Sequence, residues 1–224
     1  MLRDHEAGLW SCAQPHTMLG LHLGTRMSVV RLDDGGLWIH SPIRLTAALR
    51  QAVDALGEVR HIVCPNIYHH LYAGDWVTAF PRALVYAPER LRRKRRDLRI
   101  DTVLDGAAPL WGDQLRPVHI DGSTLDETVF VHRRARAIIS SDLVENFSAC
   151  EHGPTRLYLR ASGVYGRVGW SRLLRWVYRD HTAARRSIDR LLACDVDRIV
   201  LAHGDVIERD ARTALVETFT FLRA

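Results

Sequence analysis

The chain alternates short apolar runs with longer segments whose apolar residues recur at helical spacing. The runs GLWSCA, MSVVRL and LWIH predict strands, and DDGG between the last two predicts a hairpin turn. Further strands are predicted at HIVC, LVYA, TVFVH, RAIIS and RIVLA. TAALRQAVDAL, HTAARRSIDRLLAC and ARTALVETFTFL each place their apolar residues on one helical face.

Capping and turn residues set the predicted ends of these elements. Gly57 ends the helix predicted over residues 46–56, and Asp180 and Asp210 are the N-caps expected for the last two helices. SRLLRWVY predicts a shorter amphipathic helix, and the glycine-containing stretch before it predicts irregular structure. Strands alternating with helices predict a layered α/β fold, and the mixture of hairpins and helical crossovers predicts mixed β-sheets. We expect residues 1–224 to form a single domain.

Composition is that of an ordinary globular protein. The 224 residues are 47% hydrophobic and 25% charged. No apolar run approaches the roughly 18–20 residues that span a bilayer, and the N-terminal stretch MLRDHEAGLWSCAQ lacks the apolar core of a signal peptide. The four cysteines form no CxxC pair, which is typical of free thiols in a reducing compartment. We therefore expect a cytoplasmic protein with no membrane partner.

The positive charge has a local origin. Residues 90–99 (RLRRKRRDLR) carry seven bases and one acid, a net +6, which leaves about −1 from the formal +5 for everything else. The bases in its middle are Arg92, Arg93, Lys94, Arg95 and Arg96. No aromatic residue lies among them to stack on nucleic-acid bases. A solvated helix face or contact with an acidic partner is therefore favoured over nucleic-acid binding.

Polar side chains follow three of the predicted strands. His69 and His70 follow HIVCPNIY, Asp142 follows RAIISS, and His203 follows DRIVLA. Ligands usually bind at the edge where such strands end in layered α/β folds. Three imidazoles and one carboxylate are a donor set that suits Zn²⁺ or Fe²⁺. We therefore predict that these four residues hold one divalent metal ion.

Each of the four also has a structural interpretation without a metal. His69 and His70 are expected otherwise to bond backbone groups within their loop, and His203 to satisfy carbonyls at a strand end. Asp142 is expected otherwise to cap a helix over LVENF.

Four stretches resemble the metallo-β-lactamase superfamily. MSVVRLDDGGLWIHSP is similar to its opening hairpin, and HIVCPNIYHHLYAGDW occupies the place of its His-x-His-x-Asp-His loop. RAIISSD and RIVLAHGD resemble the strands that deliver its bridging aspartate and last histidine. The resemblance is closest to a poorly characterised bacterial branch, a domain of unknown function. It implies an αβ/βα sandwich of two mixed β-sheets flanked by helices, with a metal site along one sheet edge.

The metal motif of that superfamily is incomplete here. Aligning His69 and His70 on its Asp-His pair puts Pro65 and Ile67 in place of its first two histidines, and Thr124 near its mid-chain histidine. The resemblance thus implies that the first metal is lost and that His69, His70, Asp142 and His203 keep the second. A register with Asn66 and Tyr68 on the first two histidines is nearly as good, and His119 or His132 could replace the mid-chain ligand.

Other polar residues are expected near this site. His40 stands where the superfamily often has an aspartate, and it is either a partner that orients a metal ligand or a histidine of the core or rim. Asn66, Tyr68 and Asp75 share the histidine loop and are expected to line the pocket. Tyr68 either donates a hydrogen bond to a developing oxyanion or packs among apolar residues, which is the favoured interpretation.

These residues predict a metal-dependent hydrolase with a mononuclear site. Zn²⁺ lowers the pKa of its water to about 7, so hydrolysis of a small ester or thioester needs no catalytic residue beyond the water on the metal. The resemblance also leaves open a mononuclear iron oxygenase or redox enzyme. The third alternative is a non-catalytic binding protein whose basic segment contacts an acidic partner or nucleic acid. The sequence makes no prediction of oligomeric state.

Overall fold

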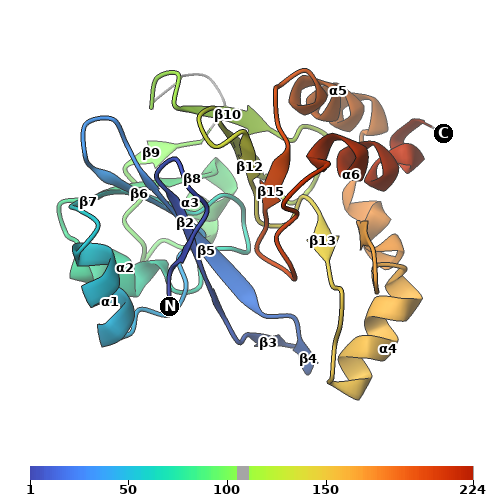
Figure 1. Cartoon of the computed structure of the whole chain (residues 1–224), viewed down its shortest axis with the longest axis horizontal. Helices are drawn as coiled ribbons and strands as arrows, with labels where there is room; N and C mark the ends of the chain where they lie inside the picture. The colour runs from blue at the N-terminus through green and yellow to red at the C-terminus, as the bar shows by residue number, and fades with distance from the viewer. Residues whose placement is uncertain (105–110, 224) are drawn as a thin grey trace.

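Two β-sheets stack face to face, and helices cover the outer face of each. The computed structural model describes residues 1–104 and 111–223. Helices α1 and α2 lie on one outer side and α5 and α6 on the other, with both sheets between them (Figure 1). This arrangement confirms the predicted αβ/βα sandwich of mixed sheets.

The first sheet orders its strands β1-β2-β5-β6-β7-β8-β9 in the described part of the chain. The strands are β1 (Arg3–Asp4), β2 (Leu9–Gln14), β5 (Thr25–Arg31), β6 (Leu37–His40), β7 (Val59–Val63), β8 (Leu84–Ala87) and β9 (Thr102–Val103). Pairs from β1 to β6 are antiparallel, and pairs from β6 to β9 are parallel. The hairpin between β5 and β6 turns at the predicted DDGG.

The second sheet orders its strands β10-β11-β12-β15. They are β10 (Leu115–His119), β11 (Thr128–His132), β12 (Ala137–Ile139) and β15 (Arg198–Val200), and only the β12–β15 pair is parallel. Two small antiparallel pairs stand apart from both sheets. They are β3 (Thr17–Met18) with β4 (Leu21–His22), and β13 (Glu145–Asn146) with β14 (Val168–Gly169).

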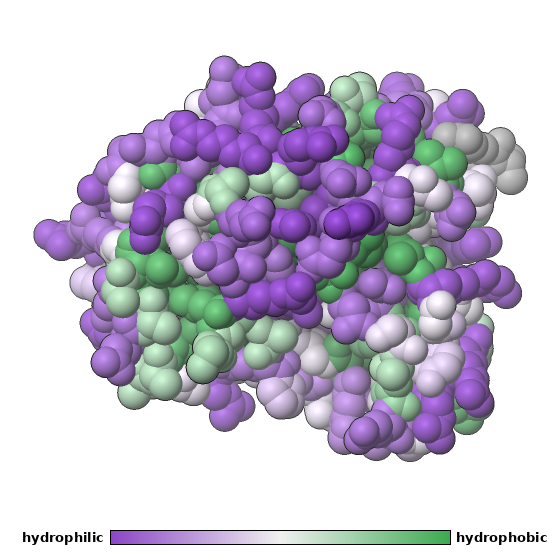
Figure 2. Space-filling view, viewed as in Figure 1, coloured by the Kyte–Doolittle hydropathy of each residue, from purple (hydrophilic) through white to green (hydrophobic). Residues whose placement is uncertain are grey.

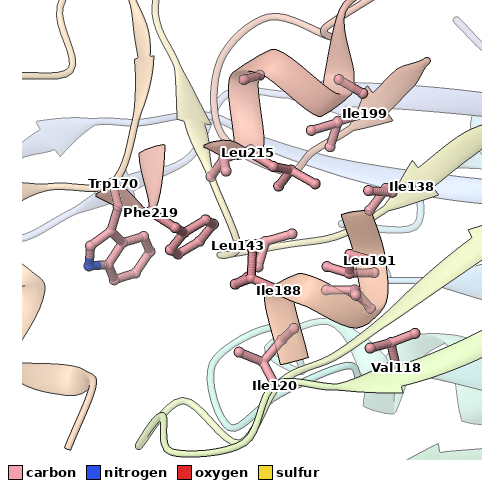
Figure 3. Close-up of a cluster of buried hydrophobic side chains, with 14 of the residues drawn as sticks. Val118, Ile120, Ile138, Leu143, Trp170, Ile188, Leu191, Ile199, Leu215 and Phe219 are labelled. Atoms are coloured by element: carbon pink, nitrogen blue, oxygen red, sulfur yellow. The ribbon is translucent and has the colours of Figure 1, made fainter. Parts of the chain in front are cut away.

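The α-helices each bury at least one residue in the interior. They are α1 (Ala47–Asp54), α2 (Ala73–Ala79), α3 (Glu89–Lys94), α4 (Gly153–Ser162), α5 (His181–Leu192) and α6 (Ala211–Thr218), with 3₁₀ helices η1 (Arg172–Val177) and η2 (Thr220–Arg223). Ile188 and Leu191 of α5 and Leu215 of α6 pack on Ile138 and Ile199 of the second sheet (Figure 3). None of the helices in the described residues is both long and apolar enough for a membrane span.

An aromatic cluster fills the space between the sheets. Trp38 of β6 meets Phe130 of β11 edge-on, with ring centroids 4.8 Å apart, and Trp111 contacts both. Because β6 and β11 lie between the aromatic cluster and the outer helices, every residue of both strands is buried. On the face drawn in Figure 2 the surface is mostly hydrophilic, and hydrophobic residues gather toward the side where α1 and α2 lie.

Helix ends are where structure and sequence differ. Asp180 caps α5 as predicted, because its side chain accepts from the backbone N–H of Ala183. Asp210 stands at the N-cap of α6 but makes no capping bond, and its φ of 61° is left-handed. SRLLRWVY forms the 3₁₀ helix η1 rather than an α-helix, and at its end the carbonyl of Val177 accepts the N–H of Thr124.

The stretch predicted as irregular contains helix α4. Gly153 and Pro154 begin it, and Gly163 ends it in the left-handed conformation with φ 76°. Glycine and proline occur at helix ends as well as in loops, so these three residues do not distinguish a helix from a loop in the sequence. The segment after Asp142 contains the short strand β13, so the prediction of an N-cap at Asp142 is wrong.

Candidate metal centre

Three of the predicted donors meet at one point between the sheets. His69 Nε2 lies 3.2 Å from His203 Nε2, and each of these nitrogens lies 3.3 Å from Asp142 Oδ1. The side chains of His69, Asp142 and His203 retain exposed fractions of 9%, 17% and 11%. The cluster is therefore almost enclosed but still open to solvent on one side.

Parallel pairing of β12 and β15 brings two of the donors together. Ile139 pairs with Val200, and Asp142 and His203 each follow three residues later. Both side chains therefore emerge from the same edge of the second sheet. His69 comes from the loop after β7 in the first sheet. That loop crosses to the second sheet, where the N–H of Thr128 donates to the carbonyl of Pro65 at 2.9 Å.

The turn after β15 fixes the orientation of His203. His203 Nδ1 donates to the carbonyl of Gly24 at 2.9 Å, which leaves Nε2 as the nitrogen that faces Asp142. Gly204 follows with φ 96°, and a Cβ at this position would overlap the backbone carbonyl of Asn146. Only glycine can therefore occupy this turn without displacing His203.

Ser41 orients His69 from the end of β6. Its Oγ lies 2.6 Å from His69 Nδ1, so the imidazole is held through the nitrogen that does not face the cluster. The backbone of Ser41 is left-handed, with φ 54°. A non-glycine residue with this φ is uncommon and often marks a functional site. This contact was not predictable from the sequence, because nothing in LWIHSP indicates a positive φ at Ser41.

Asn66 connects the loop of His69 to Asp142. Its Nδ2 donates to Asp142 Oδ2 at 2.7 Å and to Ser141 Oγ at 3.0 Å. Its Oδ1 accepts the backbone N–H groups of Tyr68 and His69 at 2.8 and 2.9 Å. Asn66 is completely buried. The amide therefore fixes the carboxylate and the imidazole at the same time.

A second carboxyl group lies behind Asp142. Glu127 accepts the backbone N–H and the hydroxyl of Ser141 at 2.8 and 2.9 Å, and it also accepts the N–H of Asp142. Burial, together with the nearby charge of Asp142, raises the pKa of Glu127 to about 8. Glu127 was not predicted as a site residue, because it precedes a strand instead of following one.

The electrostatics of the cluster favour an ionised Asp142. Burial opposes its ionisation, but His69 and His203 hold the pKa of Asp142 well below its ordinary value. Burial also opposes protonation of His203, yet its hydrogen bond to Asp142 raises the pKa of His203. Glu145 of β13 has a buried oxygen without a partner, and burial raises its pKa to about 7. The ionised carboxylate of Asp142 can therefore neutralise part of the positive charge of a bound cation.

His70 lies outside the cluster, whereas the preceding residue, His69, belongs to it. The group of donor atoms within 4.8 Å of one another contains His69, Asp142 and His203 but not His70. Arg95 donates to His70 Nδ1 at 2.9 Å, and His70 Nε2 is buried with no partner in the part of the chain that the structure describes. Burial and the charges of Lys94 and Arg95 lower the pKa of His70 to about 4. The structure therefore assembles three of the four predicted donors.

The other predicted pocket residues lie in varied surroundings. His40 is fully buried against Trp38 and Phe130, and neither of its ring nitrogens has a partner among the described residues, so it orients no ligand there through a hydrogen bond. Tyr68 is 51% exposed, and the prediction that it packs among apolar residues is wrong. Asp75 is exposed in the first turn of α2.

Neither histidine suggested as a mid-chain replacement reaches the cluster. His119 contacts Thr128 and Asp126, and His132 is buried and accepts the N–H of Ala135.

The basic segment has two structural roles around α3. Arg92 and Arg93 pair with Glu89 on the exposed helix surface. Lys94 donates to the carbonyl of Ile67 at 2.9 Å, and Arg95 pairs with Asp97 and bonds His70. Lys94 and Arg95 therefore support the loop that carries His69. Arg96 is exposed.

The donor geometry fits a tetrahedral metal ion. Bonds of about 2.0–2.1 Å to such an ion separate its ligand atoms by about 3.3–3.4 Å. The three donor separations, 3.2, 3.3 and 3.3 Å, match this spacing. Gly24, Ser41 and Asn66 each hold the atom of a donor side chain that faces away from the centre. Such outer partners are typical of metal ligands.

Comparison with solved structures identifies the fold. A metallo-β-lactamase from Pontibacter korlensis matches with a TM-score of 0.70 and 15% identity, over 100% of this chain and 98% of that one. The metallo-β-lactamase DIM-1 has the same TM-score and identity over 100% and 96%. The mono-zinc form of FIM-1 from Pseudomonas aeruginosa matches with 0.68 and 12% over 99% and 93%. The chain therefore has the metallo-β-lactamase fold.

Sequence comparison gives a narrower match. Residues 6–91 match a family described as Domain of unknown function (DUF4336). No curated protein matches the sequence. Together with the fold, the match supports the resemblance to a poorly characterised branch of metallo-β-lactamase-like proteins.

Proposed function

We propose that this protein is a metal-dependent hydrolase of a small ester or thioester, with a mononuclear site formed by His69, Asp142 and His203. The observation that carries the proposal is the set of three donor separations near 3.3 Å. Three protein ligands are the number that catalytic zinc sites use, because the fourth position is left for water or substrate.

The protein groups have defined tasks around such an ion. A divalent ion held there supplies a Lewis acid and lowers the pKa of a coordinated water. His69 and His203 provide neutral donor nitrogens, and Asp142 provides the negative charge. Asn66 and Ser41 keep the donors in position, and the small exposed fractions of the cluster limit access of bulk water.

The comparisons support the proposal at the level of the fold. The similar structures are metallo-β-lactamases, and one of them is a mono-zinc form. Identities of 12–15% carry no substrate to this chain. The four cysteines are all free, which supports a reducing, cytoplasmic compartment for this activity.

Metal reconstitution tests the proposal. The purified protein is stripped with a chelator, reloaded with Zn²⁺ or Co²⁺, and assayed with p-nitrophenyl acetate and S-phenyl thioacetate. We expect turnover only in the loaded protein, and its loss in His203→Ala. A chelated protein as active as the loaded one would contradict the proposal, as would the absence of turnover on both substrates.

A second candidate is a mononuclear iron redox enzyme. The observation that favours it is the composition of the cluster, because two histidines and one carboxylate are the ligands of many non-haem Fe²⁺ oxygenases. Metal analysis after aerobic and anaerobic purification separates the two candidates. Zinc in both preparations supports hydrolysis, and iron with oxygen-sensitive activity supports the redox enzyme.

A further inference from the structure

His16 lies next to the metal centre but outside the predicted donor set. Its backbone carbonyl accepts the N–H groups of Leu23 and Gly24, both at 3.1 Å, and so closes the hairpin of β3 and β4. Gly24 in turn accepts the hydrogen bond from His203 Nδ1. The hairpin base that carries His16 is therefore fixed directly to one of the three donors.

The side chain of His16 is fixed to the loop of a second donor. The hydroxyl of Tyr72 lies 3.4 Å from His16 Nδ1, and the two rings meet edge-on with centroids 6.3 Å apart. Tyr72 is three residues after His69 and immediately precedes α2. His16 thus bridges the segment that orients His203 and the segment that carries His69.

The charges of the cluster influence the pKa of the His16 imidazole. Burial lowers the pKa of His16, and His203 and His69 lower it further. With Tyr72, these are the titratable groups that face the ring. Among the described residues, His16 Nε2 has no hydrogen-bond partner, whereas Nδ1 is engaged by Tyr72. Nε2 is therefore the nitrogen of His16 that is free to bond a further group.

His16 is not one of the metal ligands in this arrangement. The donor atoms within 4.8 Å of one another come from His69, Asp142 and His203 alone in the described part of the chain. A histidine with one nitrogen held and the other free can accept and donate a proton at the free nitrogen.

We propose that His16 transfers a proton between water and the leaving group during hydrolysis, with Tyr72 as its positioning residue. This role rests on the proposed hydrolase function. In the balanced step, the water oxygen bonds to the acyl carbon, and the bond from that carbon to the leaving oxygen or sulfur breaks. The bonding electron pair goes to the leaving atom. One proton of the water passes through His16 Nε2 to that atom.

Substitution of His16 tests the role against a matched control. His16→Gln and Tyr72→Phe are compared with His22→Gln, because His22 belongs to the same hairpin but stacks on His152, with ring centroids 3.7 Å apart. We expect His16→Gln to bind Zn²⁺ with an affinity within about threefold of wild type and to lose about 100-fold or more in turnover of S-phenyl thioacetate. His22→Gln should match wild type in both measurements, and Tyr72→Phe should lose less turnover than His16→Gln.

The pH dependence of turnover separates proton transfer from a structural effect. Plotted against pH, wild-type turnover should show a rise or fall from the titration of His16, and His16→Gln should lack it. Turnover of His16→Gln equal to wild type would overturn the proposal. Loss of bound Zn²⁺ in His16→Gln would overturn it as well, because His16 would then be a ligand.

An NMR titration tests the placement of His16 independently of turnover. A cation bound at the cluster should lower the pKa of His16, measured from its ring resonances with and without Zn²⁺. An unchanged His16 pKa would overturn the proposal. If wild type hydrolyses neither substrate but His16 shifts, the placement of His16 is supported and the proposed hydrolase function alone fails.

Discussion

Replacement of Asn66 by alanine should weaken metal binding although Asn66 is not one of the donors. Its amide makes four hydrogen bonds, two to the segment of Asp142 and two to the backbone of the His69 loop. Asn66→Ala removes all four and leaves Asp142 Oδ2 and two backbone N–H groups without their partner. The segment of Asp142 and the loop of His69 then lose the side chain that fixes their relative position.

The size of the effect follows from these contacts. A typical hydrogen bond contributes about 0.5–1.5 kcal/mol net, so the loss of four should lower the free energy of unfolding by about 2–6 kcal/mol. Loss of an outer partner of a metal ligand typically costs 10–100-fold in metal affinity. We expect the zinc dissociation constant to rise by about that factor, which corresponds to about 1.4–2.7 kcal/mol.

Zinc affinity is measured by competition with a fluorescent chelator, and stability by urea unfolding of the metal-free protein. Gln114→Ala is the matched control. Gln114 is also a buried amide, and it bonds the backbone of Arg31 and Asp33 at 2.8 and 2.9 Å, in contacts that involve none of the donors. The control should lose stability and keep its zinc affinity. An Asn66→Ala affinity within twofold of wild type would refute the assigned role of Asn66.

The remaining predictions concern three other positions. Burial lowers the pKa of His40 to about 3 from the ordinary 6.5, so wild type should lose about 1.4 kcal/mol per pH unit as pH falls from 6.5 toward 4. His40→Leu should lack that part of the loss in urea unfolding at each pH, and an unchanged slope would contradict the buried neutral imidazole. Arg95→Ala should destabilise the protein by about 1–3 kcal/mol, because buried His70 loses its partner, whereas exposed Arg96→Ala should change stability by less than about 0.5 kcal/mol. Gly204→Ala should weaken zinc binding, since its Cβ would overlap the backbone carbonyl of Asn146 beside His203; calorimetry showing wild-type affinity would contradict this.

Most of the fold could be predicted because the chain's hydrophobic pattern agrees with its local signals. TVFVH and RAIIS are apolar runs that are predicted as strands. In the structure they contain β11 and β12, and every residue of these two strands is buried. Helix α4 was missed because Gly153 and Gly163 indicate loops as readily as helix ends. Helix η1 ends in a hydrogen bond to Thr124, a contact distant in sequence that the local pattern does not contain.

The candidate site could be predicted only in part, for a geometric reason. Asp142 and His203 leave paired parallel strands at equal offsets, so the strand pattern alone brings them together. His69 and His70 lie in an irregular loop, where side-chain direction depends on each backbone dihedral angle. The sequence does not determine whether the imidazole of His69 or that of His70 points to the cluster. Ser41 and His16 were missed because their roles arise from contacts between distant segments.

The metal content of wild type and two histidine variants tests the three-donor centre most directly. Wild type, His203→Ala and His70→Ala are loaded with Zn²⁺, desalted and analysed for zinc by mass spectrometry. We predict about one zinc per chain in wild type and in His70→Ala, and almost none in His203→Ala. Equal zinc in wild type and His203→Ala, or loss of zinc in His70→Ala, would contradict a centre formed by His69, Asp142 and His203.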